Sequence, residues 1–451
     1  MIADLKPYAE YKDSGLPWLG QVPGHWRAVR NGSLFRQRNQ TGYAALPILE
    51  VSLKTGVKVR DFGKSTRKQV MSDLGKYKRA VKGDLAYNTM RMWQGAVGVC
   101  PVDGLVSPAY VVACPYHGVE SQFFDALFRT GSYMAEIDNA SRGIVKDRNR
   151  LYWDQFKQMM SPCPPLDEQA AIVRFLDWAN GRLERTIRAK RKVIALLNEQ
   201  KQAIIHRAVT RGLDPNVPLK ASGVAWLGDI PQHWEVSRVK NEFQCLNTQR
   251  VPLNSVERGG MTSRLYYYYG ASGVIDKVEG YLFDDELLLI AEDGANLVLR
   301  NLPLAIIAVG KFWVNNHAHI LKPKRGNIVC LAHILETLNY TPWISGAAQP
   351  KLTQDRLLSI SIAVAPPDEQ EAIVRHVKKQ TQPLSAVISR LHREIDLLRE
   401  YRTRLVADVV TGKLDVREAA ARLPTIDAES PVEPDSADME EASDELVEDE
   451  A

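Results

Sequence analysis

The stretch PPLDEQAAIVRFLDWANGRLERTIRAKRKVIALLNEQKQAIIHRAV, residues 164–209, determines how this chain of 451 residues is organised. Within it, side chains recur at alternating intervals of four and three residues, which is the spacing of a coiled-coil seam. The seam positions are Leu183, Ile187, Lys190, Ile194, Leu197, Lys201, Ile204 and Ala208. Pro164 and Pro165 end the preceding segment, and Asp167 is expected as the N-cap. The pattern therefore predicts one helix, about 65 Å long, from Asp167 to Val209.

The same pattern occurs a second time in the chain. PPDEQEAIVR at 366–375 repeats PPLDEQAAIVR, and the shifted seam reads Leu384, Ile388, Leu391, Ile395, Leu398, Arg402, Leu405 and Val409. WLGQVPGHW at 18–26 recurs as WLGDIPQHW at 226–234, and AVTRGLD, ending at Asp214, recurs as VVTGKLD, ending at Asp415. Three matched blocks in the same order indicate a tandem duplication of about 200 residues.

The duplication predicts a mixed α/β protein with two similar globular regions. Two long helices separate these regions and are expected to form an antiparallel coiled coil, because a pseudo-twofold axis between duplicated halves would reverse one helix relative to the other. The predicted boundaries are 1–162, 163–212, 213–364, 365–415 and an acidic, disordered tail at 416–451. Short strand-like runs fill the globular regions, with helices expected at 122–137 and 328–338. Alternatively, each long helix packs on its own globular region.

The charge is unevenly distributed along the chain. The sequence has 58 basic and 54 acidic residues, but residues 424–451 contain twelve acidic residues and no Lys or Arg. The first 423 residues therefore carry 58 basic and 42 acidic residues, a net charge of +16. A basic body favours a polyanionic partner, whereas the tail has too little apolar surface to fold alone. We expect no membrane span and no signal peptide, and hence a cytoplasmic protein.

Motifs for catalysis and metal binding are missing from the sequence. We find no NPP[FY] tetrapeptide of an amino-methyltransferase, no phosphate-binding loop and no catalytic triad. His317 and His319 lie two residues apart without a third ligand nearby, so no metal site is predicted. The five cysteines are odd in number and scattered, which indicates reduced thiols. The chain is therefore expected to be a binding protein without catalytic residues.

Residue types that read DNA are concentrated in the two globular regions. Arg pairs with guanine, Asn and Gln pair with adenine, and Lys and Ser contact phosphates. The candidate DNA-binding residues are Tyr87, Asn88, Arg91, Trp93, Gln94, Arg142, Lys146, Arg148, Arg250, Arg264, Tyr268, Ser272, Asn296, Gln349 and Lys351, with Arg150 in the same group as Arg148. Any single member can instead lie on the surface or in the core, and about two of the four tyrosines at 266–269 are expected to point inward.

The order of blocks resembles the specificity (S) subunits of type I restriction-modification systems. The resemblance rests on Trp18-Leu19-Gly20 and Pro164-Pro165-Leu166-Asp167-Glu168-Gln169, and it covers nearly the whole chain except the tail. The second helix start, Pro366-Pro367-Asp368-Glu369-Gln370, lacks the leucine. The resemblance implies two target recognition domains, each reading one half of a bipartite sequence of double-stranded DNA, with the coiled coil setting the gap between the halves.

The resemblance also implies partners that carry the chemistry. These are two methyltransferase (M) subunits with S-adenosylmethionine, and restriction (R) subunits, possibly two, with ATP and magnesium; no cofactor is expected on this chain. Glu168, Gln169, Glu369 and Gln370, at the duplicated helix starts, are the candidate docking residues for the M subunits. The alternative function is a coiled-coil scaffold that joins two protein-binding modules without DNA specificity.

Overall fold

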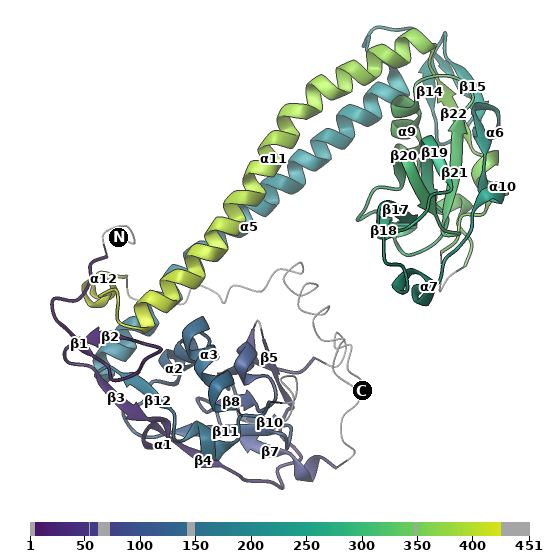
Figure 1. Ribbon diagram of the computed structural model, residues 1–451. Coiled ribbons are helices and arrows are strands. Elements are labelled where there is room, and N and C mark those ends of the chain that lie inside the picture. The colour runs from purple at the N-terminus through teal and green to yellow at the C-terminus, as the bar shows by residue number, and fades with distance from the viewer. Residues whose placement is uncertain (1–4, 54, 62–72, 142–148, 347–349, 425–451) are drawn as a thin grey trace. The chain divides into compact units, whose positions relative to one another are not determined.

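The computed structural model describes residues 5–53, 55–61, 73–141, 149–346 and 350–424 (Figure 1). By its internal contacts the chain divides into two units. Unit 1 comprises Met1–Lys190 and Arg393–Ala451, and unit 2 comprises Arg191–His392. The division passes through both long helices, so each unit contains the beginning of one helix and the end of the other.

The two long helices, α5 (Leu166–Arg211) and α11 (Pro367–Val410), form where the seam predicts them and run side by side in Figure 1. The helices begin one residue earlier than expected. Gln169 N donates to Pro165 O at 2.9 Å, so Asp167 lies in the first helical turn rather than at the N-cap. An acidic side chain in the first turn is still favourable, because it faces the positive end of the helix dipole.

Two ion pairs show the relative direction of the helices within unit 1. Lys190 Nζ lies 2.6 Å from Glu394 Oε2, and Arg402 Nη1 lies 3.4 Å from Glu184 Oε2. Residue numbers rise along α5 while they fall along α11, so the helices are antiparallel, as predicted. Lys190 and Arg402 interrupt the seam with charge, and each is matched by a carboxylate on the opposite helix.

Unit 1 is built on a four-stranded antiparallel sheet. The strand order is β4 (Phe35–Arg38), β11 (Tyr110–Pro115), β8 (Leu85–Asn88) and β9 (Val97–Val99). Two-stranded pairs surround it: β1 (Tyr11–Asp13) with β2 (Gln21–Pro23), β3 (Arg27–Arg30) with β12 (Met160–Cys163), β5 (Leu49–Ser52) with β6 (Gly56–Val59), and β7 (Lys78–Ala80) with β10 (Gly104–Val106). Short helices are α1 (Asn31–Leu34), α4 (Trp153–Phe156) and α12 (Arg417–Ala421), with 3-10 turns at Leu74–Lys76 and Met92–Gln94.

The helix predicted at 122–137 is two helices, α2 (Ser121–Phe128) and α3 (Gly131–Ala140). Thr130 separates them, because its side chain accepts a hydrogen bond from Tyr133 N and caps α3. Phe123, Phe124 and Phe128 are fully buried in the core of unit 1. The apolar pattern therefore predicted the buried face correctly but not the break.

Unit 2 contains a six-stranded sheet, four strands of which correspond to the sheet of unit 1. Its order is β16 (Phe243–Cys245), β21 (Ala318–Pro323), β19 (Phe283–Ala291), β20 (Ala305–Val314), β17 (Tyr266–Gly270) and β18 (Gly273–Val278), and only β17 and β20 pair in parallel among the described strands. β13 (Leu219–Ala221) pairs with β14 (Asp229–Pro231), and β15 (Glu235–Arg238) pairs with β22 (Ser361–Val364). The helices are α6 (Val239–Glu242), α7 (Ser255–Gly259), α8 (Asn296–Leu299), α9 (Ile328–Thr337) and α10 (Gln354–Ser359), with 3-10 turns at Asn247–Gln249 and Thr341–Trp343.

The four strands of the unit 1 sheet have counterparts, paired in the same order, in the first four positions of the unit 2 sheet. Strands β16, β21, β19 and β20 occupy the positions of β4, β11, β8 and β9 in chain order and in pairing. The hairpin of β17 and β18 is an addition to unit 2. The predicted fold class, a duplicated mixed α/β protein with a helical spacer, is thus confirmed, although the sequences of the two sheets share little.

The ordered part of unit 1 extends beyond the predicted start of the tail. Val416, Ala420 and Leu423 are buried at 0%, 2% and 6% exposure, around α12. The tail boundary at 416 is therefore wrong, because these apolar side chains complete the core. Residues 425–451 lie outside the described part. All five cysteines are unpaired, as predicted. Among the described helices, none combines the length and apolar character required to cross a membrane.

Candidate nucleic-acid interface

The end of β8 and the loop after it carry the first group of predicted DNA-binding residues. The chain turns at Met90, forms a 3-10 turn at Met92–Gln94, and returns through Gly95, whose φ of 91° suits glycine. Asn88 Oδ1 accepts from Met90 N at 3.0 Å, and Trp93 Nε1 donates to Met90 O at 2.9 Å. Hydrogen bonds within the loop therefore stabilise its conformation. Gln94 is exposed and Arg91 is half-buried.

A second predicted group meets this loop. Leu151 N donates to Thr89 O at 2.8 Å, which holds the chain from Arg150 onward against the loop. A cavity of about 420 Å³ lies between them. Its lining includes Thr89 and Met90 on the loop side, Arg150, Tyr152, Trp153 and Asp154 on the other side, and Lys78. Exposed cationic and aromatic groups are thus gathered around one concave site.

Lys78 adds a half-buried amine to this cavity. Its Nζ donates to Tyr110 O at 2.7 Å, and burial lowers the pKa of the ammonium group. Sequence reasoning missed Lys78 because it lies outside both groups, on β7, and its approach to the cavity depends on how the strands pack. Arg142, Lys146 and Arg148, predicted for this surface, lie outside the described residues.

Tyr87 was predicted to contact DNA, and the structure contradicts this. Its side chain is 0% exposed, and its ring packs at 5.2 Å from that of Phe156. The cause is strand alternation: Tyr87 points into the core of unit 1 from β8. Its hydroxyl has no hydrogen-bond partner, and burial raises the pKa of this phenol well above its ordinary value.

In unit 2, two predicted cations meet at a carboxylate that was not predicted. Arg250 Nη1 lies 2.5 Å from Glu292 Oε2, and Lys351 Nζ lies 3.3 Å from Glu292 Oε1. Burial acts to raise the pKa of Glu292, but the hydrogen bond from Arg250 and the neighbouring positive charges hold it below its ordinary value. Arg250 also donates to the backbone oxygens of Asn247, Asn316 and Ala318, so it braces the protein rather than facing DNA.

The remaining predicted residues of unit 2 have mixed positions. Tyr268 is 1% exposed and its hydroxyl bonds to Leu253, so its predicted contact with DNA is wrong, because it is one of the inward-facing tyrosines of β17. The amide of Asn296 is also occupied within the protein, because its Nδ2 donates to Leu302 O and its Oδ1 accepts from Leu302 N. Arg264 pairs with Asp276 at 3.3 Å but stays half-exposed, and Ser272 is exposed at the β17–β18 turn. Gln349 lies outside the described residues.

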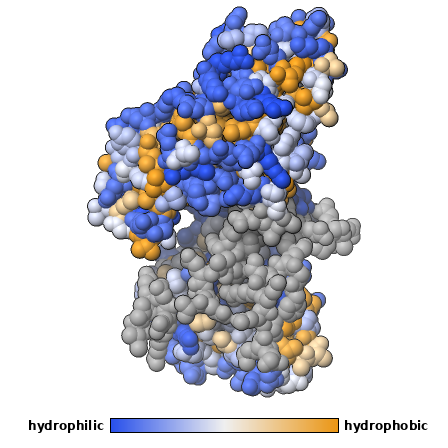
Figure 2. Space-filling view, turned by 90° about the vertical axis from the view of Figure 1, so that its right-hand side faces the viewer, coloured by the Kyte–Doolittle hydropathy of each residue, from blue (hydrophilic) through white to orange (hydrophobic). Residues whose placement is uncertain are grey.

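Unit 2 also presents aromatic rings next to lysines. Lys277 Nζ lies 5.1 Å from the ring centroid of Tyr267, and Lys311 Nζ lies 4.8 Å from that of Tyr281. Tyr267 is 48% and Tyr281 43% exposed. Figure 2 shows that hydrophobic residues, in orange, form patches among hydrophilic ones on this side of the molecule. Sequence reasoning missed both lysines, because their proximity to the tyrosines depends on strand pairing.

The duplicated sequence blocks meet each other in unit 1. The indole of Trp26, fully buried, donates from Nε1 to Glu168 Oε1 at 3.0 Å. Glu168 also accepts from Tyr8 Oη at 2.6 Å and lies 2.6 Å from His25 Nε2. Gly412, at the end of α11, approaches so closely that an added Cβ would lie 3.1 Å from Trp26. The start of α5, the end of α11 and the WLG segment therefore converge on the buried pair of Trp26 and Glu168.

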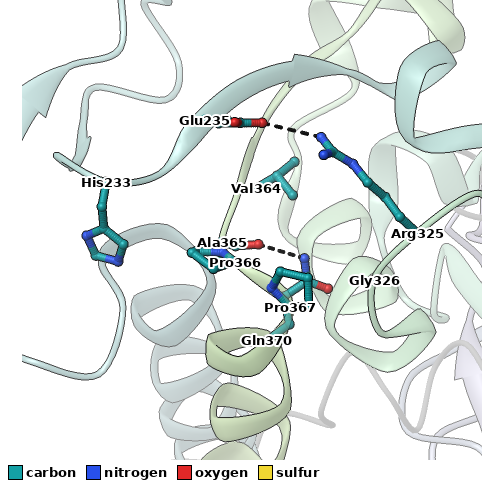
Figure 3. Close-up of a pocket in the computed structure, with 9 residues that line it drawn as sticks. All are labelled: His233, Glu235, Arg325, Gly326, Val364, Ala365, Pro366, Pro367 and Gln370. Carbon is teal, nitrogen blue, oxygen red and sulfur yellow. Dashed lines mark hydrogen bonds and ion pairs between the residues drawn. The ribbon is translucent and has the colours of Figure 1, made fainter.

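Unit 2 repeats this convergence with the helices exchanged. Trp234 Nε1 donates to Glu369 Oε2 at 3.0 Å, and His233 Nε2 lies 2.7 Å from the same oxygen. Gly212, at the end of α5, would place a Cβ 3.0 Å from Glu369. Beside it lies a pocket of about 220 Å³ (Figure 3), lined by His233, Arg325 and Gln370 among others. Glu235 and Arg325 face each other across it at 3.4 Å.

These contacts correct the prediction that the helix-start residues dock another subunit. Glu168, Gln169 and Gln370 are 3%, 1% and 2% exposed. Each glutamine bridges backbone groups of its own unit: Gln169 links Glu120 N to Pro164 O, and Gln370 links Asn327 N to Ala365 O. Glu369 is occupied by its own histidine and tryptophan. The repeated motif therefore fastens each helix start to its unit.

The histidines that follow one another near β21 diverge in the structure. His317 Nδ1 lies 2.8 Å from Asp293, whereas His319 bonds to Asn247 and to Leu352 O. Within the described residues, no group of three or more His, Cys, Asp or Glu side chains is placed to hold a metal ion.

Comparison with known proteins agrees with this arrangement. Residues 231–396 match the family model described as the type I restriction modification DNA specificity domain. A type I restriction enzyme specificity subunit of Haemophilus influenzae is 40% identical over 131 residues, which are 29% of this chain and 33% of that subunit. The type I restriction enzyme MjaX specificity subunit of Methanocaldococcus jannaschii is 20% identical over 439 residues, covering 88% of this chain and 96% of that subunit.

The fold itself also has a solved counterpart. A structure from a study of complex assembly and conformational transition of the type I R-M system is similar with a TM-score of 0.62. The alignment has 15% sequence identity and covers 87% of this chain and 99% of the other. At that identity the similarity shows a shared fold.

Proposed function

We propose that this chain is a type I restriction-modification specificity subunit and supplies DNA sequence specificity to partner enzymes. The domain match at residues 231–396 and the similarity to the MjaX specificity subunit over 439 residues support this proposal. Each unit reads one half of a bipartite target on double-stranded DNA. The observation that carries this proposal is the cavity of unit 1, where Arg150, Tyr152 and Trp153 lie across from Thr89 and Met90, which belong to the loop after β8. Deletion of the reading frame from its host should abolish one bipartite methylated adenine motif in the methylome, and persistence of all such motifs would contradict the proposal.

The chemistry of the proposed complex belongs to other chains. Two methyltransferase subunits would carry S-adenosylmethionine and the adenine-methylating site, and restriction subunits would use ATP and magnesium. The similarity to specificity subunits supports this assignment of the chemistry to partner chains. The paired long helices would set the number of unread base pairs between the half-sites, since a helical pair is stiff where a linker is not.

The cavity of unit 1 yields a direct prediction about DNA affinity. Replacement Arg150→Ala removes an exposed guanidinium at the cavity and should weaken binding of the corresponding half-site by about 1–3 kcal/mol, because one bidentate contact has that value. The assay is equilibrium binding of the assembled subunits to duplexes with one half-site altered at a time. Arg27→Ala removes an equal charge from exposed β3 and should change affinity little; equal losses would indicate a general charge effect.

Exposed apolar side chains on α11 are better candidates for partner docking than the helix starts. Leu397 is 63% and Tyr401 41% exposed, and their four-residue spacing places them on one face. The double replacement Leu397→Ser and Tyr401→Ser should weaken binding of methyltransferase subunits at least tenfold, because buried apolar anchors dominate interface energies. Pull-down with purified subunits measures this. Arg404→Ser, at a neighbouring exposed position, is the control, and unchanged binding by the double variant would refute the assignment.

One observation favours the scaffold alternative: several large hydrophobic residues of unit 2 are exposed, among them Leu265, Ile275 and Val309. A scaffold would bind proteins through these side chains without DNA specificity. Salt dependence separates the two functions, because neutralisation of phosphates makes DNA affinity fall steeply with salt.

A further inference from the structure

A row of arginines follows one face of α5 within unit 1. We call Arg174, Arg182, Arg185 and Arg188 the arginine stripe. At 100° per residue these four positions fall within about 120° around the helix axis. The buried seam residues Leu183 and Ile187, 8% and 2% exposed, lie on the opposite side of the helix. The stripe therefore faces away from the coiled-coil seam.

The stripe has a net positive charge. Residues 174–190 contain five basic residues and two acidic ones, Asp177 and Glu184. Glu184 is turned toward Arg402 on α11, and Lys190 toward Glu394. Arg185 and Arg188 make further interactions within the protein, and the segment 174–190 as a whole has an excess of three positive charges. Like charges three residues apart on a helix repel one another, so an anionic occupant would stabilise this face.

The described chain ends at this stripe. Arg174 Nη2 donates to Leu423 O at 2.7 Å and to Pro424 O at 3.2 Å. Leu423 is 6% exposed, so this attachment belongs to the folded core. Pro424, the last described residue, therefore lies directly beside the first arginine of the stripe.

The segment that starts there has the complementary charge. Residues 425–451 comprise 27 residues with twelve acidic side chains and no Lys or Arg. The stripe is about 21 Å long, from Arg174 to Arg188, at 1.5 Å per residue. A 27-residue chain can reach roughly 90 Å when extended, so the whole stripe is within reach. Tethering at Pro424 gives the segment an effective concentration of about 1 mM there.

We propose that the acidic segment 425–451 binds the arginine stripe of its own chain and excludes DNA phosphates from it. DNA is the other polyanion that could bind the stripe, but the attachment at Arg174 favours the segment already tethered there. The contact itself does not depend on the proposed function; its effect on DNA binding rests on it. The segment would reduce non-specific DNA binding by the basic body while leaving the cavity of unit 1 accessible.

Arginine modification in the full-length chain tests the contact. The test variant has every Asp and Glu of 425–451 replaced by Asn and Gln. Phenylglyoxal should modify Arg182, Arg185 and Arg188 about tenfold faster in this variant, as measured by peptide mass spectrometry, given a dissociation constant of about 0.1 mM for such electrostatic contacts. Arg27 and Arg30, exposed on β3, are internal controls and should react at equal rates in both proteins.

The outcomes separate the alternatives. High salt should remove the difference between the two proteins, since exposed charges are screened within about 10 Å at 0.1 M ionic strength. Equal rates at the stripe in both proteins at low salt would overturn the contact. If the rates are equal and fall only when duplex DNA is added, the stripe is a DNA surface and the proposal is wrong.

A second measurement tests the effect on DNA. The variant with the neutral segment should bind a random-sequence duplex about tenfold more tightly than the native chain at low salt, because the competing segment no longer occupies the stripe. Methylome motifs should be unchanged, which distinguishes a failure of this proposal from a failure of the proposed specificity function. Unchanged affinity for random DNA would overturn the competitive role.

Discussion

Insertion of four residues into α5 between Leu197 and Gln200 is expected to abolish recognition of the native bipartite site. The insertion adds about 6 Å of helix, close to two base pairs of B-DNA, and shifts the helix seam by one turn. Affinity for the native sequence should fall toward the non-specific level, by about a thousandfold or more. Binding of the assembled subunits to duplexes with spacers of different length measures the effect.

A matched insertion identifies the cause of any loss. Four residues added after Ser436, in the acidic segment, lengthen the chain equally and should leave the preferred spacing unchanged. Circular dichroism and thermal unfolding establish that the α5 variant is folded. If the folded variant keeps the same spacing preference as the native chain, helix length does not set the spacer.

Replacement Trp26→Ala should produce the largest loss of stability in unit 1. The indole is fully buried, donates to Glu168 and packs with its ring centroid 6.2 Å from that of Phe123. Truncation of a buried tryptophan lowers the free energy of unfolding by about 3–5 kcal/mol, and it also deprives a buried carboxylate of a donor. Thermal unfolding should show a decrease of roughly 6–20 °C for the transition of this unit.

Two other variants make this prediction specific. Trp226→Ala changes the first tryptophan of the second WLG segment, which is 50% exposed, and should cost much less. Trp26→Phe retains most of the ring but loses the donor to Glu168, so it should fall between the native chain and Trp26→Ala. Equal losses for Trp26→Ala and Trp226→Ala would mean that convergence at Glu168 does not stabilise the unit.

The sequence predicted the long helices and the duplication because both signals are local or repeated. Leu183, Ile187 and Ile194 follow the seam and are buried as the heptad spacing requires. The break at Thr130 was missed because a side-chain cap within an otherwise helical pattern has no strong periodic signal. The partners of Lys190 and Arg402 lie more than 200 residues away, so only the duplicated symmetry indicated that α11 would supply them.

The interface was predicted less well, for a physical reason. Residue type indicates which side chains suit DNA but not which face of a strand they occupy, and Tyr87 and Tyr268 both point inward. Glu168 was selected because it is repeated, yet repetition here preserves a buried contact with Trp26, 142 positions away. The useful signal was the joint repetition of the WLG and DEQ blocks, which indicates that these blocks touch.

The exchange of helix ends between units has a consequence for synthesis on the ribosome. Leu405, Val409 and Val410 complete the core around Trp26, although more than 200 residues separate them from the unit 1 sheet. At 5–20 residues per second, the sheet would wait roughly 15–60 s for that apolar surface to be covered. The nascent first unit would therefore need protection by a chaperone until translation reaches the end of α11.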